Sequence, residues 1–79
     1  MKATNCKLYA KGFITIYISG NFNVTDYSIT GDLEDFHVYD ANDVLIDAWW
    51  SEDEKHCLDD LFSKYDIKMV TCEKDPHNI

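Results

Sequence analysis

The sequence predicts a small α+β domain in which one helix covers one face of an antiparallel sheet of four to five strands. Apolar and polar residues alternate in several short stretches, turn-forming residues separate these stretches, and one later segment repeats its apolar residues with a helical period. Because no helix connects the early strands, they should pair antiparallel, in the order ββββαβ. The domain is expected to span residues 1–75, with a frayed tail at 76–79.

The first strands are predicted from three alternating stretches. A short one covers 6–10, and a clearer one at 13–19 places three isoleucines on one face and Tyr17 on the other. Gly20-Asn21 is typical of a turn. A weaker strand is predicted at 24–30, with Tyr27 and Ile29 facing inward, ending at Gly31-Asp32.

The clearest hairpin pairs residues 36–39 with 44–50. The loop between them, Asp40-Ala41-Asn42-Asp43, is rich in turn formers. Alternation then divides the second strand into two faces. The predicted core face carries Val44, Ile46, Ala48 and Trp50, and the opposite face carries Leu45, Asp47 and Trp49.

One helix is predicted after this hairpin. Ser51 can cap it, Glu54 stands where a capping box needs an acid, and the acidic first turn suits the positive end of the helix. Leu58, Leu61, Phe62 and Tyr65 form one apolar stripe. The helix should end at Asp66, before a last strand at 67–72. It should cover the isoleucine face and leave the other face of the sheet open to water.

The cysteines and the apolar segments predict a compartment. Cys6, Cys57 and Cys72 are odd in number and widely spaced, unlike a disulfide framework or a zinc motif. They are expected to be unpaired thiols in a reducing cytoplasm. No signal peptide and no membrane span is visible.

Known catalytic and metal-binding patterns do not fit this sequence. His37, His56 and His77 are scattered, and His56 and Cys57, adjacent on the predicted helix, would point about 100° apart. The calcium-loop pattern that begins at Asp40 fails, because Leu45 stands where a glycine is required. We therefore predict no enzyme, no metal site and no cofactor. A metal site formed by the cysteines and histidines is the least favoured alternative.

The charge is strongly negative and unevenly distributed. The chain has fifteen acidic residues, seven lysines and no arginine, and its net charge is −8. Residues 12–54 contain ten of the acids and no lysine. Such a field repels phosphate backbones and anionic membranes and favours a basic protein surface. The alternative is that the charge serves only solubility.

Aromatic residues add a second signal. Strand parity places Tyr17, Tyr39 and Trp49 on the face away from the helix, together with His37, Leu45 and Asp47. Tyrosine and tryptophan are enriched in binding hot spots. The predicted partner-binding residues are Tyr17, Asp32, Glu34, Asp35, His37, Tyr39, Asp40, Asp43, Asp47, Trp49, Glu52 and Asp53. The alternative is that this face is covered by the N-terminal segment or by a second copy in a homodimer.

In size, acidity and lack of arginine the chain resembles small bacteriophage proteins that disable host defences, such as inhibitors of CRISPR systems and DNA-mimicking antirestriction proteins. The resemblance concerns the overall character of the whole chain, and no motif carries it, so it transfers no functional residue. It implies an inhibitor in the bacterial cytoplasm that blocks the nucleic-acid-binding or assembly surface of a host defence complex. In this role carboxylates replace phosphates against lysine and arginine. A homodimeric structural or regulatory protein is the alternative function.

Overall fold

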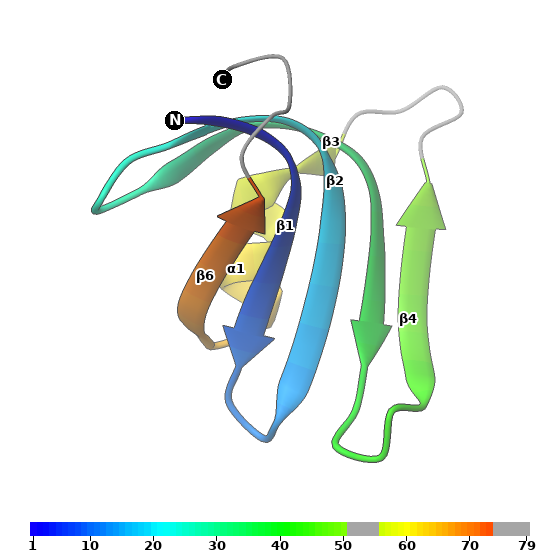
Figure 1. Cartoon of the computed structure of the whole chain (residues 1–79). Coiled ribbons are helices and arrows are strands. Elements are labelled where there is room, and N and C mark those ends of the chain that lie inside the picture. Colours follow the sequence, from blue (N-terminus) through cyan, green and yellow to red (C-terminus); the bar gives the residue numbers. More distant parts are fainter. Residues whose placement is uncertain (51–55, 74–79) are drawn as a thin grey trace.

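The computed structural model describes residues 1–50 and 56–73, and it confirms an α+β fold built on an antiparallel sheet. The strands are β1 (Lys2–Ala10), β2 (Ile14–Val24), β3 (Ile29–Tyr39), β4 (Leu45–Trp50), β5 (His56–Cys57) and β6 (Ile67–Glu73), and the helix is α1 (Leu58–Lys64). The strand order is β4-β3-β2-β1-β6, and β5 pairs with the far part of β3 (Figure 1). The first four strands therefore form a meander, and β6 returns to pair with β1.

The face of the sheet covered by α1, called the inner face here, contains the core. Ile16 and Ile18 of β2 are almost completely buried with Leu8 and Val38, as the isoleucine alternation predicted. Leu58 and Leu61 of α1 belong to the same cluster. Burying aliphatic side chains of this size contributes about 1.5–3 kcal/mol each, so this layer supplies most of the stability.

The turn predicted at Gly20-Asn21 is wrong, because β2 continues through it. Gly20 is buried, and a Cβ atom there would collide with the carbonyl oxygen of Asp32. The pairing of β2 with β3 shifts register between Ser19 and Gly20. Above this level the upper parts of β1, β2 and β3 bend together (Figure 1). This glycine thus permits a close backbone approach at a bulge instead of a turn.

The strand predicted at 24–30 is also wrong, since residues 25–28 form the turn between β2 and β3. The Thr25 hydroxyl accepts hydrogen bonds from the backbone N–H groups of Tyr27 and Ser28, at 3.3 and 3.1 Å. These local bonds replace strand pairing. Tyr27, expected to face inward, is 98% exposed, whereas Ile29 packs against the core as expected.

The helix is shorter than predicted. The expected cap Ser51 and capping-box residue Glu54 lie outside the described residues. His56 and Cys57, expected on the helix, instead form β5 and pair with Leu33 and Asp32. Within the predicted stripe Leu58 and Leu61 are buried and Tyr65 packs against the core, but Phe62 is exposed. α1 thus contains three residues of the predicted stripe, and two of them are buried.

The faces predicted for residues 47–50 of β4 are inverted, whereas Leu45 lies opposite Tyr39 on the face away from α1, as predicted. Trp49 is the cross-strand partner of Phe36; their rings stack with centroids 6.0 Å apart, and Trp49 packs against the core. Asp47 lies opposite the buried Val38. The residues expected in the core, Val44, Ile46 and Trp50, are exposed and Ala48 is half-buried. Alternation separates two faces without saying which one is inside, and a register shift after Val38 sets the phase of this strand.

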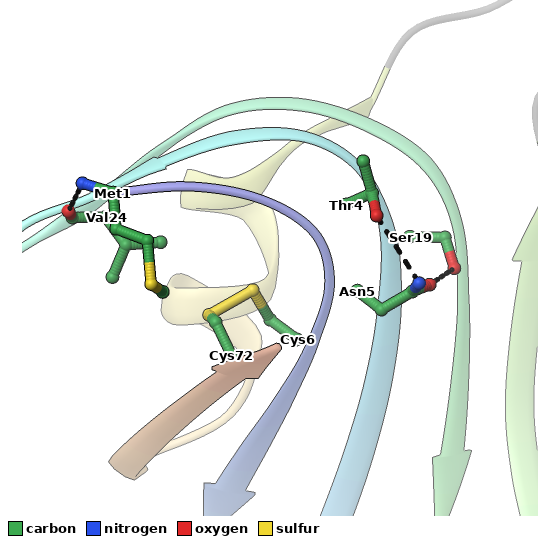
Figure 2. The surroundings of a disulfide bond; sticks show 7 residues. All are labelled: Met1, Thr4, Asn5, Cys6, Ser19, Val24 and Cys72. Carbon is green, nitrogen blue, oxygen red and sulfur yellow. Dashed lines mark hydrogen bonds between the residues drawn. A yellow bond between two sulfur atoms is a disulfide. The ribbon is translucent and has the colours of Figure 1, made fainter. Parts of the chain in front are cut away.

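The prediction of three unpaired cysteines is wrong. Cys6 of β1 and Cys72 of β6 are cross-strand partners, with Cα atoms 4.0 Å apart, and form a disulfide (Figure 2). They are 66 residues apart in the sequence, so only the strand order brings them together. Unpaired thiols therefore no longer support a reducing compartment. No helix in the described part of the chain is long and apolar enough to cross a membrane.

Candidate partner-binding face

The face of the sheet away from α1, called the outer face here, is formed by three rows of cross-strand neighbours. Each row crosses β6, β1, β2, β3 and β4 in that order. The central row is Thr71, Lys7, Tyr17, His37 and Ala48; one neighbouring row is Met69, Tyr9, Thr15, Tyr39 and Leu45; the other is Glu73, Asn5, Ser19, Asp35 and Trp50. The rows place tyrosines from three different strands near the centre of this face.

An aromatic pair lies at the centre of the outer face. The rings of Tyr17 and Tyr39 contact each other edge to face, with centroids 5.6 Å apart and an interplanar angle of 84°. His37 lies directly opposite Tyr17, two residues before Tyr39 on β3. The structure therefore brings three of the predicted binding residues together, on the face where strand parity expected them.

A lysine lies beside this aromatic pair. The Lys7 amino group is 5.0 Å from the ring centroid of Tyr9 and 5.2 Å from that of Tyr17. Hydrogen bonds to Tyr9 and Tyr17 favour the ammonium form and raise the pKa of Lys7 above its usual value. Sequence reasoning missed Lys7 and Tyr9. The alternation at 6–10 contained the signal, because both residues stand between positions that face the core.

An open hollow of about 540 Å³ lies on the outer face next to the hairpin loop. It is lined by Thr15, Tyr17, His37, Tyr39 and Asp43. The loop holds Asp43 at the edge of this hollow with a positive φ of 60°. The phenol rings of Tyr17 and Tyr39, the imidazole of His37 and the carboxylate of Asp43 thus line the same hollow.

Asp40 has a structural role in the same loop. Its carboxylate accepts hydrogen bonds from the backbone N–H groups of Asn42 and Val44, at 2.8 and 3.0 Å. An aspartate that bonds the backbone ahead of it stabilises a turn. Asp40 therefore positions Asp43, which lines the hollow itself.

The other predicted residues do not gather around the hollow. Asp32 and Glu34 are exposed on the far part of β3, and Asp35 lies on the outer face opposite Ser19. Asp47 accepts a hydrogen bond from the Lys64 ammonium group at 3.0 Å, on the side of α1, and Trp49 belongs to the inner face. Glu52 and Asp53 lie outside the described residues. The acidic field is thus spread over several parts of the molecule.

The hollow combines groups that recognise cations. Tyrosine rings attract ammonium and guanidinium groups through their π faces, and a carboxylate at the rim adds a charge-assisted hydrogen bond. Within residues 1–50 and 56–73, no three His, Cys, Asp or Glu side chains are arranged to hold a metal ion. The rings and the carboxylate around the hollow are groups that can contact a basic side chain.

No family model, no curated protein and no solved structure matches this chain.

Proposed function

We propose that this protein is an acidic binder whose outer face attaches to a basic protein surface. The observation that carries the proposal is the hollow on the outer face of the sheet, in which Tyr17, Tyr39 and Asp43 line a space of about 540 Å³. Tyrosine is one of the residue types enriched in interface hot spots. The function requires no catalytic group and no cofactor.

The charge of the chain selects the class of partner. At a net charge of −8, nucleic acids and anionic membranes are repelled, whereas a surface rich in lysine and arginine is attracted. The attraction speeds the encounter, and the buried rings slow the release. In this proposal an arginine or lysine of the partner enters the hollow from the side of Tyr39 and Asp43, because Lys7 already occupies one side of Tyr17.

The proposed target is a nucleic-acid-handling complex of a bacterial defence system, and the proposed origin is a bacteriophage. This step is supported by the resemblance in size, acidity and lack of arginine to small anti-defence proteins. In this role the protein covers a basic surface that the host complex uses for nucleic acid or for assembly. It would act in the bacterial cytoplasm.

Capture from a bacterial lysate, quantified by mass spectrometry, tests the proposal with matched baits. Tyr39→Ala and Asp43→Asn alter the hollow, while Tyr27→Ala and Asp26→Asn make the same changes in the exposed turn between β2 and β3. We expect the first two baits to lose the partner and the second two to retain it. With the captured partner purified, loss of the Tyr39 ring should weaken binding by about tenfold or more.

The salt dependence of that binding is the second readout. Affinity should fall as salt rises, because screening weakens the attraction between opposite charges. The proposal is overturned if binding is insensitive to salt and all four variants bind like the unaltered protein.

A further inference from the structure

Tyr17 is flanked on the outer face by two equivalent positions. β1 and β3 both pair antiparallel with β2, so they run parallel to each other on its two sides (Figure 1). Lys7 of β1 and His37 of β3 both lie directly opposite Tyr17. Two residues further along each strand, Tyr9 and Tyr39 lie opposite one and the same residue of β2. His37 thus occupies on β3 the place that Lys7 occupies on β1.

On the β1 side, a cation already lies against the tyrosine rings. The Lys7 ammonium group is 5.0 Å from the ring centroid of Tyr9 and 5.2 Å from that of Tyr17. The negative face of an aromatic ring attracts a cation at this distance. Hydrogen bonds to both tyrosines raise the pKa of Lys7, in agreement with a stabilised charge. The outer face therefore holds a positive charge where the residue opposite Tyr17 supplies one.

On the β3 side, the equivalent residue belongs to a type that changes its charge with pH. Histidine is the side chain that ordinarily does so between about pH 5 and 8. His37 is half-buried and lines the hollow together with the two tyrosines Tyr17 and Tyr39 and with Asp43. Among the described side chains, no lysine pairs with Asp43 or lies over the ring of Tyr39. A neutral His37 therefore leaves the ring of Tyr39 and the carboxylate of Asp43 to a cation from outside the chain.

We propose that His37 is a pH-dependent competitor of the basic side chain that the hollow binds. The inference rests on the proposed function, because that function places an arginine or lysine of the partner in the hollow. A protonated His37 carries a positive charge in the hollow itself, as Lys7 does on the other side of Tyr17, and repels a second cation. At a protein surface, two like charges about 5 Å apart repel strongly enough to change an equilibrium about tenfold. Binding of a basic side chain should therefore weaken as the pH falls.

The surroundings of His37 contain acids, tyrosines and one lysine. The titratable and charged side chains that face it are Tyr17 of β2, Lys7 beyond Tyr17 on β1, Asp35 and Tyr39 of β3, and Asp43 of the hairpin loop. On β4 the residue opposite His37 is Ala48, and the acid of that strand, Asp47, bonds to Lys64 on the side of α1. Of these side-chain types, only histidine ordinarily changes its charge between about pH 5 and 8. A change in binding over this range is therefore assigned to His37.

Titration of the whole chain with N-acetyl-arginine amide, whose guanidinium group is its only charge, tests the inference. Binding is followed through the NMR signals of the Tyr17 and Tyr39 rings at constant ionic strength. We expect saturable changes at about pH 8 and a dissociation constant about tenfold higher at about pH 5. Equal affinity at the two pH values overturns this inference and leaves the proposed function intact. Absence of binding at both pH values contradicts the proposed function as well.

Three variants locate the pH dependence. His37→Gln keeps a neutral polar side chain, so its dissociation constant should be the same at both pH values. His37→Lys gives the β3 side the chemistry of the β1 side, and binding should be weaker by about tenfold or more even at the higher pH. His56→Gln, in β5, is the matched control and should keep the pH response of the unaltered protein. The inference is overturned if His37→Gln retains that response or if His37→Lys binds as tightly as the unaltered protein.

The unaltered protein provides a measurement that does not depend on how the variants fold. Without any added compound, protonation of His37 changes the electric field at the rings of Tyr17 and Tyr39. Their NMR signals should therefore shift together with those of the His37 ring as the pH falls from about 8 to about 5. Tyr27, exposed in the turn between β2 and β3, supplies the reference signal and should not follow His37. Signals of Tyr17 and Tyr39 that do not follow His37 contradict the proposed competition.

Discussion

The inner and outer faces of the sheet are formed by the same strands, but they carry different kinds of side chain. The inner face buries aliphatic residues against α1 and contains the Cys6–Cys72 disulfide. The outer face carries Tyr17, Tyr39 and His37 around an open hollow, and Lys7 lies beside Tyr17. Adjacent positions of one strand can therefore serve folding and binding separately, because alternate side chains point to opposite faces. Changes to the inner face should therefore lower stability, and changes to the outer face should lower binding.

Loss of the disulfide should have the largest effect on stability. A bond between residues 66 apart restricts the unfolded chain, and the chain-entropy relation gives about 4 kcal/mol for a loop of this length. This is a large part of the stability of a small domain. We expect the double variant Cys6→Ser, Cys72→Ser to unfold at much lower urea concentration than the oxidised protein.

The remaining cysteine supplies the control for this prediction. Cys57→Ser leaves the disulfide in place, so reductant should destabilise it as it destabilises the unaltered protein. The double variant should not respond to reductant. An oxidised protein that reductant leaves equally stable would contradict the assigned role of the disulfide.

Two neighbouring tryptophans give the sharpest contrast between the faces. Trp49 packs on Phe36 within the core, whereas Trp50 is exposed on the outer face. Trp49→Ala should lower the free energy of unfolding by about 2–3 kcal/mol, since the side chain is partly buried. Trp50→Ala should change it by less than about 0.5 kcal/mol. Urea denaturation measures both, and a larger loss with Trp50→Ala than with Trp49→Ala would show that β4 has the other phase.

Loss of the Asp47–Lys64 ion pair should have the smallest effect on the free energy of unfolding. The side chains are 63% exposed for Lys64 and 33% for Asp47, so solvent screening limits the contribution to less than about 0.5 kcal/mol. The hydrogen bond to Asp47 raises the pKa of Lys64 above 10.5. A raised lysine pKa stabilises the fold fully below the unfolded value, and this stabilisation is lost as pH rises through the folded value.

Thermal unfolding at neutral and at strongly alkaline pH tests this pH dependence of the stability. Asp47→Asn should lower the melting temperature slightly at neutral pH and bring no further loss above the folded pKa of Lys64. Asp43→Asn is the matched control on the outer face, and it should follow the pH profile of the unaltered protein. A larger effect of Asp47→Asn at alkaline than at neutral pH would reverse the expected linkage.

Local patterns in the sequence determined the elements whose partners are close along the chain. The isoleucine alternation placed Tyr17 on the outer face, and the turn residues 40–43 defined the hairpin that holds Tyr39 and Asp43 near each other. The last strand, predicted at 67–72, agrees with β6. The α+β class follows from the same patterns, because periods of two and of about 3.6 residues distinguish strands from helices.

The way these elements meet depends on contacts that form in the folded chain. The register shift in β3–β4 put Trp49 inside and Trp50 outside, and the return of β6 to β1 joined Cys6 to Cys72. The pairing of β1 with β2 brought Lys7 onto Tyr17. The physical reason is the same in each case. Alternation gives a strand two faces but neither its neighbour nor its register, and these depend on contacts between residues far apart in the sequence.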